Sequence, residues 1–196
     1  SHFSFSTPKQ SFHISLDPGK CIFMNRIWCD AKQCVQYLYK KLQHNKVKNP
    51  PNQLSRLSHY HLVTHLNTLY SNALVSTDSG NTTPYVSESW VSIHPKSFFS
   101  PTDYSSMGFS LPCMYGALKH SNKTGIAFVG DGAFLMTYQI LSQIQQNNTN
   151  IIIVVFRDNQ LGMIHGIQVK SNHKTTTSIP HYDLKYFAEL FDFGVV

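Results

Sequence analysis

Two unbroken apolar runs, at residues 126–129 and 151–156, lie in the second half of the chain, and each has the length of a strand. A strand, a helix and a second strand at this spacing predict a βαβ unit, whose strands are parallel and whose crossover is right-handed. The second run is β-branched without polar alternation, which is typical of a strand covered on both faces. Between the runs, apolar side chains recur at helical spacing at Phe134, Tyr138, Leu141 and Ile144.

Further periodic segments flank this unit. The pattern predicts an amphipathic helix around residues 62–70, a strand at 73–77, a buried helix at 111–118 and a final helix at 182–191. Residues 98–106 and 168–178 are expected to be loops. Together these elements predict an α/β protein: a doubly wound parallel sheet with helices on both faces.

The part before residue 51 has a different pattern. Phe12, Ile14 and Leu16 alternate with polar residues, as in a half-buried strand, and apolar residues follow Asp30 at helical spacing. Residues 44–51 are polar and end in Asn-Pro-Pro, which is the composition of a linker. We therefore expect a domain boundary near residue 50.

Composition narrows the function classes. A chain of 196 residues with 41% hydrophobic residues is typical of a globular protein. No apolar run approaches the roughly 20 residues of a membrane span, and the first residues lack a signal-peptide pattern. The four cysteines form no CxxC pair, so we expect a reduced, cytoplasmic protein. The net charge is +6, but Lys and Arg are scattered, so we expect no nucleic-acid partner.

Two aspartates follow the two apolar runs. Asp131 stands between Gly130 and Gly132, and Asp158 comes 27 positions later. In a parallel sheet, ligands bind beyond the carboxyl ends of the strands, where these side chains would converge. Paired carboxylates repel unless a cation lies between them, and oxygen ligands favour magnesium or calcium. The glycines would admit a diphosphate. Two ordinary capping or turn aspartates are the alternative that spacing alone leaves open.

The same stretch resembles the signature of thiamine-diphosphate-dependent enzymes, in which GDG is followed by about two dozen residues, an apolar strand and Asn or Asp. The resemblance is to the acetolactate synthase and pyruvate decarboxylase branch, and it extends over nearly the whole chain in the family's order. The segments that carry it are "HISLDPGK" with "CDAKQCVQYLYKKL", "TDSGNTTPY", "SSMGFSLPCMYGAL", "VGDGAFL" and "HYDLKYFAELFDFGV".

The resemblance implies a cofactor site for thiamine diphosphate and Mg²⁺. The metal would be held by the side chains of Asp131 and Asp158 and by the backbone carbonyl of Gln160. Met107 would support the V shape of the cofactor, and the backbone of Ser105 would receive its aminopyrimidine ring. The other residues implied in cofactor binding are Ser79, Gly80, Asn81, Thr82, Gly130, Gly132, Ala133, Gly162 and Met163.

Three positions depart from the family pattern. Ser105 stands where the family usually has glycine, so its Cβ would crowd the pyrimidine. Arg157 replaces the first residue of an Asn-Asn pair, beside the accepted ligand variant Asp158. Thr82 replaces a histidine, which leaves any substrate role of that histidine unsupported here.

The resemblance also implies a domain organisation. Residues 1–50 match the C-terminal remnant of a central domain plus a linker, and residues 51–196 a diphosphate-binding domain truncated at its C-terminus. Family members activate the cofactor with a glutamate from a pyrimidine domain, and neither Glu88 nor Glu189 lies in a matching segment. We assign no catalytic residue here. The chain is expected to need the pyrimidine domain of the same or a partner chain, to be inactive alone, and to form a homo-oligomer at full length.

The implied activity is carboligation or decarboxylation of a small 2-oxo acid such as pyruvate. Two alternatives remain open: a cofactor-binding subunit of a split decarboxylase, and a non-catalytic relic of the fold. Outside this site, His61 and His65 favour a solvated helix face over a metal site, and Cys113 a packed apolar position. Asp78 is expected to cap a backbone turn and not to bind metal.

Overall fold

The computed structural model describes residues 13–14, 26–27, 59–174 and 176–195. The chain divides into two compact units, Ser1–Pro50 and Pro51–Val196. In the first unit the described residues are strand β1 (His13–Ile14) and strand β2 (Arg26–Ile27), which pair in parallel. The helix predicted after Asp30 lies outside the described residues, and the assignment of this unit to a central-domain remnant stays a prediction.

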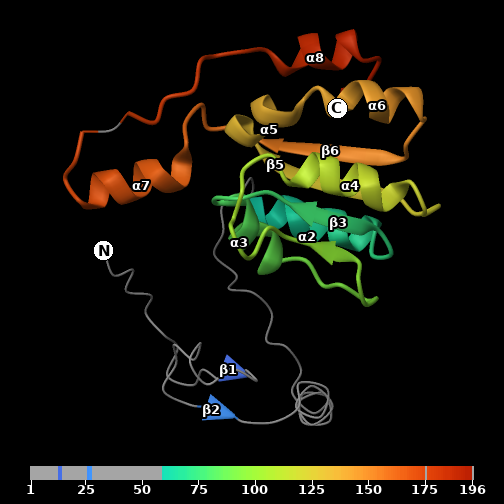
Figure 1. Ribbon diagram of the computed structural model, residues 1–196, viewed down its shortest axis with the longest axis horizontal. Helices are drawn as coiled ribbons and strands as arrows, with labels where there is room; N and C mark the ends of the chain where they lie inside the picture. The colour runs from blue at the N-terminus through green and yellow to red at the C-terminus, as the bar shows by residue number, and fades with distance from the viewer. Residues whose placement is uncertain (1–12, 15–25, 28–58, 175, 196) are drawn as a thin grey trace. The chain divides into compact units, whose positions relative to one another are not determined.

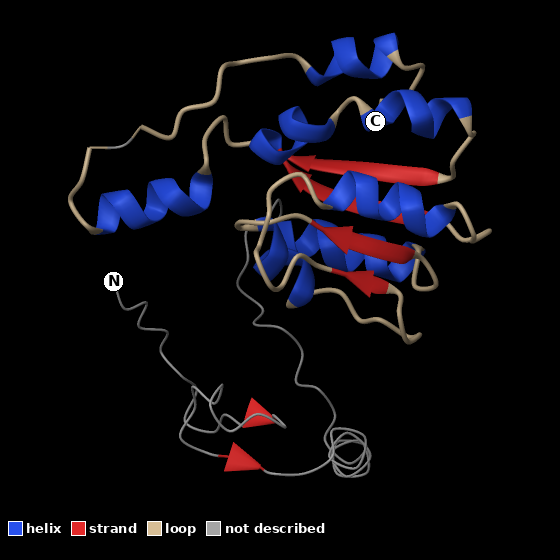
Figure 2. Ribbon diagram, in the orientation of Figure 1, coloured by secondary structure: helices blue, strands red, loops and turns tan. Residues whose placement is uncertain are grey.

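The second unit is built on a parallel sheet (Figures 1 and 2). Its four strands lie in the order β4-β3-β5-β6, and each pairs in parallel with its neighbour. Because consecutive strands are parallel, every connection crosses a face of the sheet, and helices occupy these crossovers. The strands are β3 (Leu74–Thr77), β4 (Phe98–Phe99), β5 (Gly125–Gly130) and β6 (Ile151–Phe156).

Seven helices lie within the described residues. They are α2 (His59–Leu69), α3 (Thr82–Ser87), α4 (Ser110–Leu118), α5 (Asp131–Thr137), α6 (Ile140–Gln146), α7 (Gly162–Lys170) and α8 (Leu184–Leu190).

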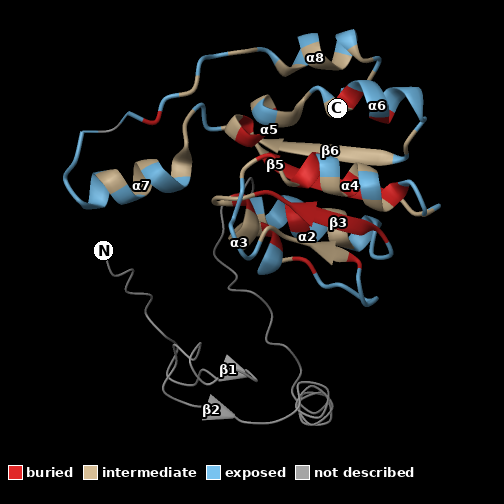
Figure 3. Cartoon of the chain, in the orientation of Figure 1, coloured by how far each residue is buried: buried red, intermediate tan, exposed pale blue. Residues whose placement is uncertain are grey.

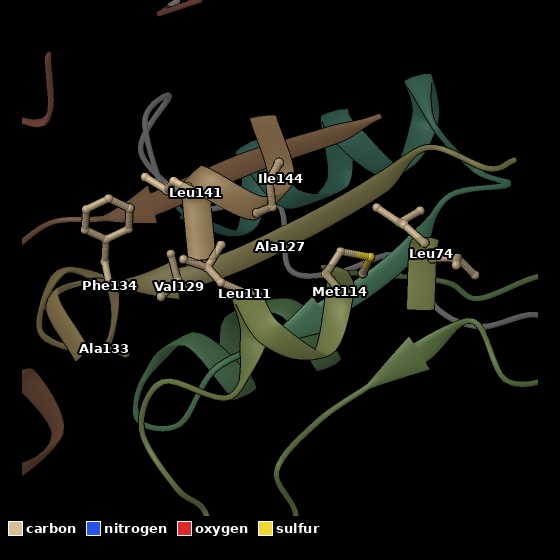
Figure 4. Close-up of a cluster of buried hydrophobic side chains, with 10 residues drawn as sticks. Leu74, Leu111, Met114, Ala127, Val129, Ala133, Phe134, Leu141 and Ile144 are labelled. Atoms are coloured by element: carbon tan, nitrogen blue, oxygen red, sulfur yellow. The ribbon is translucent and has the colours of Figure 1, made fainter. Parts of the chain in front are cut away.

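Alternate residues of the central strands pack into two clusters, one on each face of the sheet. Leu74, Ala127 and Val129 pack with side chains of α4, α5 and α6, as Figure 4 shows. Val75 and Phe128 point the other way, into a cluster with residues of α2 and α3. Both faces of the sheet are therefore covered, which confirms the predicted doubly wound α/β fold.

Helices α7 and α8 contribute little to this core. Neither contains a fully buried residue, and both are drawn largely as exposed or half-buried in Figure 3. Partly buried Leu184, Phe187 and Phe191 attach α8 to the cluster formed with α4, α5 and α6. Of α7, the apolar residues Met163, Ile164, Ile167 and Val169 are exposed.

Several elements differ from the sequence prediction. The helix predicted from one apolar face after β5 is two helices, since a turn at Tyr138 and Gln139 separates α5 from α6. The predicted loop at residues 98–106 begins with the short strand β4, and α7, which the pattern did not predict, extends into the expected loop at 168–178. Strand β6 is at an edge of the described sheet. All six of its residues are half-buried, so it is less covered than its unbroken apolar run indicates.

Candidate functional site

A pocket of about 330 Å³ lies where the loops after β3, β5 and β6 meet. Its volume is in the range of small-molecule sites, and its place at the carboxyl ends of parallel strands is where such folds bind ligands. Every residue that the sequence analysis assigned to the cofactor or the metal lines it. These are Ser79, Gly80, Asn81, Thr82, Ser105, Met107, Gly130, Asp131, Gly132, Ala133, Asp158, Gln160, Gly162 and Met163.

Asp131 is the first residue of α5 and is buried, with 3% of its surface exposed. Its Oδ1 accepts the amide of Gly132 at 2.9 Å. Its Oδ2 accepts the amides of Asn159 at 2.7 Å and Asp158 at 3.2 Å. These three bonds direct the carboxylate across to the loop after β6. Each carboxylate oxygen offers two lone pairs, so Oδ1 keeps one for a cation.

The carboxylate of Asp158 accepts a longer bond than those of Asp131, since the amide of Gln160 donates to its Oδ1 at 3.3 Å. Partial shielding from water raises the pKa of its carboxyl group, and the negative charge of Asp131 raises it further, while the bond from Gln160 opposes both. The two carboxylates are thus close enough to repel each other. A divalent cation between them would remove that repulsion.

Two glycines next to these carboxylates allow neighbouring side chains to approach the backbone closely. A Cβ on Gly162 would collide with the carboxylate of Asp158 and come within 3.1 Å of Asn81 Nδ2. A Cβ on Gly132 would lie 2.8 Å from Ile179 Cδ1 and 3.3 Å from Met107 Cε. The first residues of α5 and α7 line the pocket, and a helix start is where backbone amides lack acceptors within the helix.

Asp78, at the end of β3, is fully buried and does not line the pocket. Its carboxylate accepts the amides of Ser79 and Gly108, each at 2.9 Å, and of Ser110 at 2.8 Å. Burial raises its pKa, and these bonds partly offset the rise. The residue therefore fastens the loop after β3 to the start of α4, which is the capping role predicted from the sequence.

Ser105 adopts a left-handed backbone conformation, with φ of +51°. Glycine enters this region without a steric penalty and other residues do not, which accounts for the glycine usual in the family. The Oγ atoms of Ser105 and Ser79 lie 3.1 Å apart at the rim of the pocket. The side chain thus projects where the resemblance places the aminopyrimidine.

One wall of the pocket is aromatic and was not predicted from the sequence. The ring of His59, from α2, stacks on Tyr85 of α3 at 4.6 Å and meets the edge of Phe156 at 4.8 Å. His59 lies 97 positions before Phe156, and no spacing rule connects them. Leu161 and Ile164, on either side of the start of α7, also line the pocket without having been assigned.

Arg157 lines the pocket between β6 and Asp158. Its Nε donates to Asn159 Oδ1 at 3.0 Å, and its guanidinium lies 5.5 Å from the centre of the Tyr182 ring. Its Nη2 is buried and finds no acceptor among the residues that the structure describes. Tyr182 in turn donates its hydroxyl to the backbone carbonyl of Asp131 at 2.9 Å. Burial and the charge of Asp131 raise the pKa of Tyr182 to about 12, so this hydroxyl keeps its proton.

The described residues hold no group of three or more His, Cys, Asp or Glu side chains arranged for a metal. A magnesium ion at Asp131 and Asp158 would take its remaining ligands from backbone carbonyls, water and phosphate. That mixture is usual for Mg²⁺, which is commonly bound by one or two carboxylates plus substrate phosphates. Among the described helices, none is long and apolar enough to cross a membrane.

Residues 78–196 match the family "Thiamine pyrophosphate enzyme, C-terminal TPP binding domain". This match covers more than half of the chain, so the chain belongs to that family. It includes the loop after β3 and the ends of β5 and β6, and therefore nearly all of the pocket. The resemblance recognised from the sequence is thereby confirmed.

The chain is also similar to parts of longer proteins. The chain is 26% identical over 117 residues to the acetolactate synthase isozyme 1 large subunit of Escherichia coli, covering 59% of this chain and 21% of that protein. It is 32% identical over 96 residues to a probable acetolactate synthase large subunit of Methanococcus aeolicus, covering 48% and 16%. It is 32% identical over 98 residues to a probable 2-ketoarginine decarboxylase of Pseudomonas aeruginosa, covering 49% and 18%. The chain thus spans about a fifth of the length of these relatives.

Proposed function

We propose that residues 51–196 bind thiamine diphosphate together with Mg²⁺ and form the diphosphate-binding part of a 2-oxo acid carboligase or decarboxylase. The single observation that carries this proposal is the meeting of Asp131 and Asp158 in one pocket. Asp131 is buried there and tied to the loop of Asp158 by two amides. The charge of Asp131 raises the pKa of Asp158, so the two carboxylates repel each other unless a cation lies between them.

The residues that line the pocket fit thiamine diphosphate and Mg²⁺. The carboxylates of Asp131 and Asp158 and the carbonyl of Gln160 supply the hard oxygen ligands that Mg²⁺ requires. The missing side chain at Gly162 leaves room for the Asp158 carboxylate, and the start of α7 would present amides to a phosphate beside it. The side chain of Met107 lies beside Gly132, where it would prop the cofactor from below.

Thiamine diphosphate, when bound, supplies the electron sink for decarboxylation and carbon–carbon bond formation. The chain's own residues bind it, orient it and keep its diphosphate next to the metal. Leu161, Ile164 and the aromatic wall of His59, Tyr85 and Phe156 would form the apolar lining beside it. We assign none of these residues to a proton transfer.

The remaining parts of the proposal concern the complete enzyme. Activation of the cofactor would come from a glutamate of a pyrimidine domain, in the same or a partner chain, within a homo-oligomer. Alone, the chain would bind the cofactor without turnover. The relatives include acetolactate synthases and a decarboxylase, and they support a 2-oxo acid substrate without selecting between the two reactions.

Thermal unfolding with thiamine diphosphate tests the cofactor site. We expect the melting temperature to rise with cofactor and Mg²⁺ together, and this rise to vanish in Asp131→Ala. Asp103→Ala is the control, because Asp103 is an exposed carboxylate that does not line the pocket, and it should keep the full rise. An equal rise in the presence of a chelator would contradict the magnesium-bridged site.

A further inference from the structure

Asp131, the candidate metal ligand, is held by two neighbours that both contact Arg157. Asn159 donates its amide to the Asp131 carboxylate, and Tyr182 donates its hydroxyl to the Asp131 carbonyl. Arg157 Nε donates to the side chain of Asn159, and its guanidinium packs over the ring of Tyr182. One cationic side chain therefore connects the two groups that fix Asp131 from different sides.

The first connection fixes a residue whose backbone is left-handed. Asn159 has φ of +55°, a region that asparagine enters more readily than most other non-glycine residues. Its carbonyl accepts the amide of Ile179 at 2.9 Å, and its side chain accepts Arg157 Nε. With both ends of Asn159 held, its amide points at Asp131 Oδ2 at 2.7 Å, which is the shortest bond that the carboxylate makes.

The second connection runs through aromatic packing. The Tyr182 ring stacks on Phe134 of α5 at 6.4 Å and meets the edge of Phe187 of α8 at 5.7 Å. The guanidinium of Arg157 lies on this ring, an arrangement that attracts a cation to the π-face. Arg157 thus keeps the ring where its hydroxyl reaches the Asp131 carbonyl. Glutamine at position 157 carries no positive charge and would not provide this contact.

We propose that Arg157 is a positioning residue of the magnesium site, which holds Asp131 in the orientation that binds the metal through Asn159 and Tyr182. This inference rests on the proposed function, because it presupposes that Asp131 binds Mg²⁺. Groups that orient a metal ligand commonly change metal affinity by 10–100-fold when they are removed. Arg157 is not among the residues that the family pattern assigns, because that pattern has asparagine at this position.

The test is a magnesium titration of the full chain at a saturating concentration of thiamine diphosphate, followed by the thermal shift. In Arg157→Gln we expect the half-saturating Mg²⁺ concentration to rise at least 10-fold. The shift at saturating Mg²⁺ should be retained, because the ligands themselves are intact. A merely structural role would lower the melting temperature and leave the magnesium midpoint in place.

Lys119→Gln is the matched control. Lys119 also lies over a tyrosine ring, 5.1 Å from the centre of Tyr115, and also donates to an asparagine, Asn147 Oδ1, at 2.7 Å. It does not line the candidate cofactor pocket. This variant loses the same two kinds of contact and should keep the wild-type magnesium midpoint.

Tyr182→Phe is the second test variant, which is used if Arg157→Gln does not fold. It keeps the ring under the guanidinium and removes only the hydroxyl that reaches Asp131, so we expect a several-fold rise in the magnesium midpoint. A wild-type midpoint in a folded Arg157→Gln, or in Tyr182→Phe where the first variant does not fold, would overturn the inference. If the wild-type chain shows no magnesium-dependent shift at all, the proposed function itself is wrong.

Discussion

The amide of Asn159 donates to Oδ2 of Asp131 at 2.7 Å, although the two residues are 28 positions apart in the sequence. The bond joins the end of β5 to the loop after β6, so the two strand ends that carry the acidic pair behave as one unit. A carboxylate fixed in this way is already oriented before any ligand binds. Its orientation is therefore a property of the fold, and substitutions around it have consequences that can be measured.

Magnesium binding should weaken as the pH falls. Shielding from water and the charge of Asp131 raise the pKa of Asp158, so its ionised form is disfavoured in the folded chain. Without metal, its contribution to stability is full below the ordinary carboxyl pKa and is lost as the pH rises through the raised value. Mg²⁺ binds the ionised form, so affinity should increase with pH over that interval. Magnesium titrations at several pH values measure this change in affinity.

Asp158→Asn is the control for this pH dependence. The amide retains a ligand oxygen and cannot ionise, so the variant should show weaker magnesium binding with a flatter pH profile. A profile as steep as that of the wild type would assign the pH dependence to another group.

Gly162→Ala should abolish cofactor binding while the chain stays folded. Gly162 begins α7, and a Cβ added there would collide with the Asp158 carboxylate and crowd Asn81. Gly166→Ala, one turn further along the same helix, meets nothing within 4 Å. It should bind normally and gain up to about 1 kcal/mol of stability from the better helix propensity of alanine. Isothermal titration with thiamine diphosphate and Mg²⁺ separates the two variants, and equal binding by both would refute the predicted clash.

Ser105→Gly should both stabilise the chain and tighten cofactor binding. Removing the Cβ relieves a left-handed conformation and adds about 1 kcal/mol to the free energy of unfolding. It also clears the rim of the pocket. Lys96→Gly is the control, since Lys96 has φ of +58° but does not line the pocket. It should gain similar stability in urea unfolding with no change in cofactor affinity.

Asp78→Ala should be among the most destabilising substitutions of a polar residue. Two buried backbone amides and one partly buried amide would lose their acceptor, at a total cost of about 3 kcal/mol. Asp103→Ala, at an exposed carboxylate, should change the free energy of unfolding by less than about 0.5 kcal/mol. Urea denaturation measures both. A small loss for Asp78→Ala would show that water or a neighbouring side chain replaces its carboxylate.

The local pattern of the sequence was enough for the central βαβ unit and for the acidic pair. Unbroken apolar runs mark β5 and β6, and residues that follow parallel strands meet at one edge of the sheet. That rule predicted that Asp131 and Asp158 would converge, although it left two separate capping aspartates as an alternative, and the structure has both in one pocket. The family resemblance added the glycines and the loop residues 79–82, which now line the same pocket.

Other features depended on contacts that no local pattern encodes. Helix α7 has no buried residue, so its sequence lacks the one-sided apolar stripe by which a helix is recognised. The break at Tyr138 and Gln139 is invisible to periodicity, because α5 and α6 both turn apolar residues toward the same core cluster. The partial burial of β6 follows from its place in the strand order, and strand order is a long-range property.

By itself, the sequence determined the strands of the central unit, the acidic residues at their ends and the family of the chain. Each of these depends on neighbouring residues or on fixed spacings along the chain. Only the tertiary structure decided that His59 reaches the pocket, that Arg157 connects Asn159 to Tyr182, and that Asp78 fastens β3 to α4. The physical reason is that hydrogen bonds and ring contacts depend on distance in space, and folding brings together residues that the chain keeps far apart.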